Sequence, residues 1–224
     1  MKLFNKLFSK KNELSKSKNK NMILVEAYWN DTADKTLVAE LDNILQDCST
    51  RAEEFVRIAE LCLPATTNEQ LYYASKAYVW AGASYRKEAI YYLEKYIESG
   101  ATYEGTPSGI REMNGVVYDL KALSISTTYS DLAKCYESEY EFDKAIENYE
   151  KATSFSPHNQ SFIINLSNVY VKKNQLEKAK DILEAATHSE AYKDEGFRTA
   201  IDKYLIDIND KIKRGYIYKP RKKK

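Results

Sequence analysis

Large and small residues recur with a fixed period along the middle of this chain. Two copies of a 34-residue pattern lie end to end over residues 126–193, with large residues at positions 4, 7, 11 and 24 and small ones at positions 8, 20 and 27. They are Tyr129, Leu132, Tyr136 and Tyr149 with Ala133, Ala145 and Ala152, then Ile163, Leu166, Tyr170 and Leu183 with Ser167, Ala179 and Ala186. Both groups of positions have helical spacing, so each copy is predicted to form two amphipathic helices that pack closely at the small residues.

Further helix pairs are expected on either side, because one pair cannot bury its own apolar faces. The predicted pairs cover residues 33–63, 70–103, 126–159 and 160–190, and a capping helix covers 195–213. The 70–103 pair departs from the pattern at Lys76, where a large apolar residue is expected, and at Tyr96, where a small one is expected. The first half of the 33–63 pair is one residue out of register.

The 34-residue spacing resembles the tetratricopeptide repeat, a helix–turn–helix unit that stacks on copies of itself. The resemblance implies an all-α fold, an α–α superhelix of three to four helix pairs plus a C-terminal capping helix, over residues 22–214. It also implies a binding protein without catalytic activity, whose partner is another protein or an extended peptide. In that family the first helices of successive repeats line a concave groove.

Ten residues match the groove positions of the family: Leu71, Tyr78, Asp131, Lys134, Glu137, Ile164, Asn165, Asn168, Val171 and Lys172. Asn165 is at a position where family members that hold a peptide backbone or carboxylate carry Asn, whose amide donates and accepts at once. The family's clamp for chaperone tails would need Lys in place of Ser130 and Asn in place of Lys134, so that ligand is not expected. The alternative is that Asn165 and Asn168 are ordinary polar residues on an exposed helix face, with no role in binding.

An insertion of 22 residues, 104–125, separates the second predicted pair from the third. Loops of this length in a compact domain are functional or disordered. We expect a surface excursion whose end, residues 116–123, adds a turn or two of helix, since Val117, Leu120 and Leu123 have the spacing of a core face. No segment alternates over a useful length, so no strand is predicted.

The net charge of +1 hides an acidic body with two basic ends. Residues 1–20 carry seven Lys and one Glu, residues 211–224 carry eight Lys or Arg and no acid, and residues 21–210 carry a net charge of −13. We interpret 1–21 and 215–224 as flexible, solvated basic segments. The alternative is a weak contact of residues 1–20 and 211–224 with an anionic membrane or a nucleic acid.

The N-terminal residues give that alternative some support. Leu3, Phe4, Leu7 and Phe8 share one helical face among lysines, and basic amphipathic segments bind membrane surfaces. The apolar stretch is too short for a signal peptide, and no segment is long enough to span a bilayer.

Candidate catalytic or metal-binding residues are sparse. His158 and His188 lack metal-site spacing, and Cys48, Cys62 and Cys135 are scattered within helical patterns, which suits a reducing cytoplasm. No phosphate-binding or nucleophile motif is present in the sequence. The sequence therefore predicts a cytoplasmic protein that is no enzyme, with no cofactor, metal or small-molecule substrate.

Three functions remain open at this point. The first is an interaction scaffold that binds a protein or peptide in the groove of the repeats. The second is a peripheral tether that brings the repeats to a membrane or ribonucleoprotein through the basic ends. The third is a small-peptide sensor resembling the pheromone-binding repeat proteins of some bacteria, which we rank last because those proteins also carry an effector module.

Overall fold

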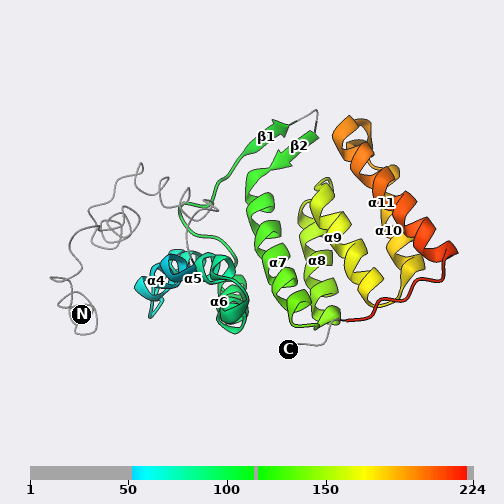
Figure 1. Ribbon diagram of the computed structural model, residues 1–224. Coiled ribbons are helices and arrows are strands. Elements are labelled where there is room, and N and C mark those ends of the chain that lie inside the picture. Colours follow the sequence, from blue (N-terminus) through cyan, green and yellow to red (C-terminus); the bar gives the residue numbers. More distant parts are fainter. Residues whose placement is uncertain (1–51, 114–115, 221–224) are drawn as a thin grey trace, which may run out of the picture.

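The computed structural model describes residues 52–113 and 116–220, which form an array of helices with one short hairpin (Figure 1). The α-helices are α4 (Ala52–Leu61), α5 (Asn68–Ala81), α6 (Arg86–Glu98), α7 (Leu120–Ser138), α8 (Phe142–Phe155), α9 (Gln160–Lys172), α10 (Leu176–Thr187) and α11 (Glu195–Lys213). The strands are β1 (Ile110–Met113) and β2 (Val116–Asp119), and the 3-10 helices are η2 (Ala83–Tyr85) and η3 (Glu190–Lys193). Each helix packs mainly on its neighbours in the chain, as a repeat array requires.

The helix pairs predicted from the 34-residue pattern are present. They are α5 with α6 for 70–103, α7 with α8 for 126–159, and α9 with α10 for 160–190, followed by α11 for the capping helix at 195–213. The small residues Ala133, Ala145, Ser167 and Ala179 are fully buried, with 0 % exposure. The Ser167 hydroxyl donates a 3.0 Å hydrogen bond to the Ala179 carbonyl, so α9 and α10 approach closely at these two residues.

The described part of the array begins with α4, the second half of the pair predicted at 33–63. Its Phe55, Ile58 and Ala59 are buried in the core cluster that also contains the apolar residues of α5. The first half of that pair and the basic segment 1–21 lie outside the described residues.

The bulky Tyr96 at a small-residue position belongs to an aromatic cluster. Its ring centroid lies 5.6 Å from that of Tyr72 on α5, which lies 4.9 Å from that of Tyr103. Tyr103 follows α6 and immediately precedes the insertion, so the cluster fixes the start of the insertion to the 70–103 pair.

The insertion contains a β-hairpin that the sequence analysis did not predict. β1 pairs antiparallel with β2, and the helix expected from Val116 onwards begins only at Leu120. There the Asp119 carboxylate caps α7 by accepting the amide of Ala122 at 3.0 Å. Val117 is 58 % exposed, so the prediction that it faces the core was wrong. The run Val–Val–Tyr is β-branched and aromatic, which favours a strand over a helix.

The hairpin contacts the C-terminal half of the array. The Tyr118 hydroxyl donates to the His158 carbonyl at 3.4 Å, and Val116 packs against the core cluster formed by α9, α10 and α11. Figure 1 shows the hairpin reaching from α7 towards the adjacent end of α11.

Glu69, in the first turn of α5, is half-buried near Glu104 of the insertion. Burial, and then repulsion from Glu104, raises the pKa of Glu69 from 4.5 to about 6. Because the folded-state pKa lies above the unfolded value, the stability that protonated Glu69 confers is lost as the pH rises from 4.5 to about 6. We expect Glu69→Gln to raise the thermal midpoint at about pH 7.5 and to leave it unchanged at about pH 4.

Melting curves followed by circular dichroism at both pH values would check this expectation. The matched control is Glu88→Gln, because Glu88 is an exposed carboxylate in the first turn of α6. An equal rise of the Glu69→Gln midpoint at both pH values would show that the effect comes from packing and not from charge.

The end of the described chain also departs from expectation. Residues 215–224 were predicted to be a solvated tail, but the Tyr218 amide donates to the side-chain oxygen of Asn174 at 2.6 Å. Tyr218 thus contacts the repeats although residues 215–217, 219 and 220 are exposed, and 221–224 lie outside the described residues. α11 itself buries Phe197, Ile201 and Ile208 and closes the apolar end of the array.

Candidate interaction surface

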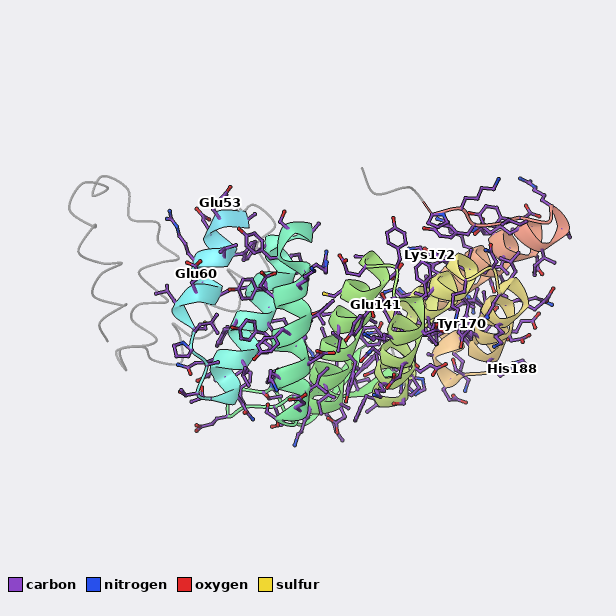
Figure 2. All side chains as sticks on the ribbon, turned by 90° about the horizontal axis from the view of Figure 1, so that it is seen from below. Glu53, Glu60, Glu141, Tyr170, Lys172 and His188 are labelled. Atoms are coloured by element: carbon purple, nitrogen blue, oxygen red, sulfur yellow. The ribbon has the colours of Figure 1, made fainter. Side chains whose placement is uncertain are left out.

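The ten predicted groove residues lie on α5, α7 and α9, the first helices of three successive pairs. Figure 2 shows Glu53 and Glu60 of α4 at one end of the array and His188 towards the other, with Glu141, Tyr170 and Lys172 between them. Ion pairs described below connect α5 to α7 and α7 to α9. These three helices are therefore neighbours in space although other helices separate them in sequence.

Three of the predicted residues are packed inside the array. Tyr78 is buried, and its ring is stacked on that of Tyr92 with centroids 5.6 Å apart. Burial, and then the neighbouring Tyr92, raises the pKa of Tyr78 to about 12. Ile164 and Val171 are buried in the cluster of α9, α10 and α11. None of these three side chains is accessible to a ligand, and Leu71 is only half-buried.

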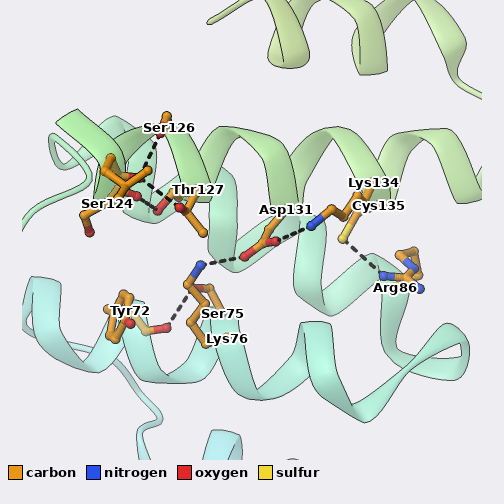
Figure 3. A network of polar contacts seen from close by, with 12 residues as sticks. Tyr72, Ser75, Lys76, Arg86, Ser124, Ser126, Thr127, Asp131, Lys134 and Cys135 are labelled. Atoms are coloured by element: carbon orange, nitrogen blue, oxygen red, sulfur yellow. Dashed lines mark hydrogen bonds and ion pairs between the residues drawn. The ribbon is translucent and has the colours of Figure 1, made fainter. Parts of the chain in front are cut away.

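Asp131 connects α7 to the preceding pair instead of facing solvent (Figure 3). The Lys76 ammonium of α5 lies 2.6 Å from its carboxylate, and these side chains are only 10 % and 13 % exposed. Lys134, one turn further along α7, lies 3.3 Å from the other carboxylate oxygen. Lys76 therefore occupies an apolar repeat position because its charge is neutralised by the next repeat.

The charge on Asp131 is held by its partners. Burial alone would raise the pKa of Asp131, but Lys76 and Lys134 outweigh it and hold this pKa below its ordinary value of 3.8. The carboxylate is therefore ionised at neutral pH and joins α5 to α7 as one half of a largely buried ion pair.

Glu137 plays the corresponding part between α7 and α9. Its carboxylate pairs with the Lys172 ammonium and accepts a 3.0 Å hydrogen bond from the Tyr149 hydroxyl of α8. Burial, followed by the charge of Glu137, raises the pKa of Tyr149. Four predicted ligand-binding residues, Asp131, Lys134, Glu137 and Lys172, are thus engaged within the protein, although Lys134 and Lys172 keep partly exposed side chains.

Asn165 and Asn168 differ from these four residues. Both are half-buried on α9, at the repeat positions that Asp131 and Lys134 occupy on α7. Within the described part of the chain, neither amide side chain has a hydrogen-bond partner, whereas Ser167 and Tyr170 beside them do. Each amide can therefore still donate to and accept from an external group.

A cavity of ≈ 410 Å³ lies between α6, α7 and α8, away from the ten predicted residues. Tyr136 lines it and donates from its hydroxyl to Glu94, and burial, followed by that bond, raises the pKa of Tyr136. Lysine ammonium groups cover the two tyrosine rings of the cavity, Lys144 at 4.9 Å from the Tyr136 centroid and Lys151 at 5.7 Å from that of Tyr129. Its walls are thus charged and its polar groups mostly paired.

A second cavity of ≈ 660 Å³ lies between the hairpin and the start of α11. It is lined by Val116 and Val117, by His158, and by Glu190, Lys193, Asp194 and Glu195. The His158 ring nitrogen Nδ1 is buried without a hydrogen-bond partner. None of the ten predicted residues lines either cavity.

The described residues offer little for catalysis or metal binding. Cys62 and Cys135 are buried, and burial raises the pKa of the Cys135 thiol although Arg86 donates to its sulfur at 3.3 Å. A raised pKa disfavours the reactive thiolate. Over residues 52–113 and 116–220 no three His, Cys, Asp or Glu side chains gather as a metal site would require. None of the helices described is both long and apolar enough to cross a membrane.

The paired helices, the buried small residues and the ion pairs between successive first helices define a helical repeat protein. Residues 136–192 match the family model of the tetratricopeptide repeat. Residues 136–192 therefore carry the tetratricopeptide repeat, a unit that in general mediates protein–protein interactions.

The fold also resembles several solved structures. One is MamA, with a TM-score of 0.45 and 16 % identity over 82 % of this chain and 97 % of that chain. Another is a Podosopora anserina protein with nearly identical TPR-like repeats, with a TM-score of 0.44 and 14 % identity over 87 % of this chain and 94 % of that chain. No curated protein matches the chain in sequence.

Proposed function

We propose that this protein is a non-enzymatic scaffold that binds an extended peptide or a segment of a partner protein along the exposed side of α7 and α9. The residues that would contact the partner are Lys134, Asn165, Asn168 and Lys172. Tyr78, Ile164 and Val171 are left out because they are buried, and Asp131 and Glu137 act in joining the repeats.

One observation carries this proposal. The equivalent positions of two successive repeats are used differently. Asp131 pairs with both Lys76 and Lys134, whereas Asn165 and Asn168 have no hydrogen-bond partner among the described residues. Neither amide is among the buried polar atoms without a partner, so water reaches both in the free protein, and a ligand that covers them has to replace those hydrogen bonds. An extended backbone offers alternating donors and acceptors, which is the pattern that a pair of amides on one helix face can satisfy.

The charges nearby indicate what kind of segment would fit. Lys134 and Lys172 are each paired with an acid, so this side of α7 and α9 has no strong charge of its own. The acidic body, with its net charge of −13 over residues 21–210, favours partners that are neutral or mildly basic. We therefore propose a polar or mildly basic extended segment.

The test is to select binders from a random peptide library with the full-length protein and to measure them against Asn165→Ala/Asn168→Ala. Loss of two amide hydrogen bonds, each contributing about 1 kcal/mol, is expected to weaken binding at least about tenfold. Fluorescence anisotropy with a labelled selected peptide gives the affinities, and circular dichroism checks that the helices remain.

Glu177→Ala/Asp181→Ala is the matched control, because both acids are exposed on α10. Unchanged affinity in the Asn165→Ala/Asn168→Ala variant would place the binding surface elsewhere. If the protein instead binds anionic vesicles or RNA and this binding disappears as salt rises, the basic ends carry the function. The tether then replaces the scaffold as the proposed function.

A further inference from the structure

The chain after α11 turns back onto the ends of the repeats. Gly215 adopts a left-handed φ of +61°, and the amide of Tyr216 donates to the Lys211 carbonyl at 2.9 Å. These two features form a Schellman motif, which ends α11 and reverses the chain direction. Residues 215–220 then run along the ends of α9 and α8 (Figure 1).

The side-chain amide of Asn174, between α9 and α10, binds the backbone of this segment at Tyr218. The Tyr218 amide donates to the Asn174 side-chain oxygen at 2.6 Å, and the Asn174 side-chain nitrogen donates to the Tyr218 carbonyl at 3.4 Å. One side-chain amide thus satisfies both polar groups of one extended residue, as a neighbouring strand would. Asn174 has a left-handed φ of +59°, a conformation that Asn tolerates better than most residues.

The ring of Tyr218 contacts the preceding repeat. Its centroid lies 6.3 Å from that of Phe142 at an interplanar angle of 77°, an edge-to-face contact. Tyr140 lies at 6.0 Å from Phe142 and is itself in the left-handed region, with φ +64°. Tyr140 is at the repeat position of Asn174, and the Glu141 amide donates to the Tyr136 carbonyl at 3.0 Å, so this left-handed residue ends α7 in a Schellman motif.

The charges on the two sides are complementary. Phe142 has Glu139 and Glu141 before it in the sequence and Asp143 after it. Tyr218 is followed by Lys219 and by the basic residues 221–224. Glu141 pairs with Lys144 of its own repeat and Asp143 pairs with Lys173 of the next repeat, so the turn is mildly acidic and the attraction is modest.

We propose that Phe142 and Asn174 form a second peptide site, separate from the α7–α9 surface, that accepts an extended segment of tyrosine followed by basic residues. Its occupant is the C-terminal segment of the same chain. Backbone pairing with Asn174 supplies affinity, the Phe142 contact selects the aromatic ring, and the acidic turn favours the lysines after it. A partner segment of the same pattern binds there only by displacing the C-terminus.

The test uses a fluorescein-labelled peptide of residues 215–224 and the full-length protein. A tethered competitor has an effective concentration in the millimolar range, so Tyr218→Ala, which weakens the internal contact, should bind the peptide at least about tenfold more tightly than the wild type. Adding Asn174→Gly to Tyr218→Ala should abolish that binding, because glycine keeps the left-handed turn and removes only the side-chain amide. Ile217→Ala is the control and should behave as the wild type, since Ile217 is exposed.

Several results would overturn the proposal. The site does not exist if no variant binds the peptide, or if Tyr218→Ala/Asn174→Gly binds as tightly as Tyr218→Ala. The C-terminal segment is not its occupant if wild type and Tyr218→Ala bind equally. A wild-type dimer seen by sedimentation velocity and lost in Tyr218→Ala would show that the segment belongs to a second copy, which contradicts the intramolecular contact.

Discussion

Asp131→Ala is expected to lower the free energy of unfolding by about 3 kcal/mol, the cost of removing one partner from a buried ion pair. The substitution leaves the Lys76 ammonium between α5 and α7, in a place where its side chain is only 10 % exposed. For a protein of this size the loss corresponds to a fall of roughly 6–12 °C in the thermal midpoint. Urea unfolding followed by circular dichroism measures it directly.

Two further variants separate the possible causes. Lys134→Ala removes the exposed partner of Asp131 and should cost less than about 1 kcal/mol. Lys76→Met/Asp131→Leu replaces both charges by apolar groups and should recover most of the stability lost in Asp131→Ala. If Asp131→Ala costs no more than Lys134→Ala, the pair between α5 and α7 does not stabilise the joint between repeats.

The same ion pair predicts an acid dependence. Since the pKa of Asp131 is lowered on folding, its contribution is complete above the ordinary value of 3.8 and is lost as the pH falls below it. The stability of the wild type relative to Lys76→Met/Asp131→Leu should therefore fall on acidification and stay constant on moving to mildly alkaline pH.

Ala179→Leu is expected to destabilise the protein by about 2–3 kcal/mol, because a larger side chain forces apart the close approach of α9 and α10. Ala179 has 0 % exposure, and its carbonyl accepts the Ser167 hydroxyl at 3.0 Å from the facing helix. The added three carbons have no space without separating these two groups. The change should also lower the signal for native packing in the near-ultraviolet spectrum.

Ala185→Leu on the same helix is the matched control, because Ala185 is exposed. It makes the same chemical change and should alter the stability by less than about 0.5 kcal/mol. Equal effects of the two substitutions would mean that the small positions of the repeat do not set the distance between its helices.

The repeat architecture could be predicted from sequence because its determinants are local and periodic. Alanine and serine at fixed positions indicate helix contacts without knowledge of the rest of the chain, and Ala133, Ala145, Ser167 and Ala179 are all buried as that reasoning requires. The hairpin was missed because the spacing of Val117, Leu120 and Leu123 fits a helix. The β-branched pair before Tyr118 and the capping residue Asp119 were the signals against it.

The ion pairs between repeats could not be predicted from the sequence, for a different reason. Repeat positions indicate which helix face a residue occupies, but they do not show which charges meet across repeats that are distant in sequence. Lys76 and Asp131 are 55 residues apart, and Glu137 and Lys172 are 35 apart, so their pairing depends on how the repeats stack. Asn174 was missed because it lies in a turn, outside the helical positions from which the groove was inferred.

The hairpin changes how the array can come apart. In a simple solenoid each repeat touches only its neighbours, so terminal repeats can fray while the middle stays folded. Here Tyr118 precedes α7 but bonds to His158 at the start of the next pair, and Val116 packs against the cluster that includes α11. Unfolding of α10 and α11 would therefore also remove contacts of the hairpin, which precedes α7 in the chain. The hairpin thus ties the C-terminal units to the centre and makes their unfolding cooperative with it.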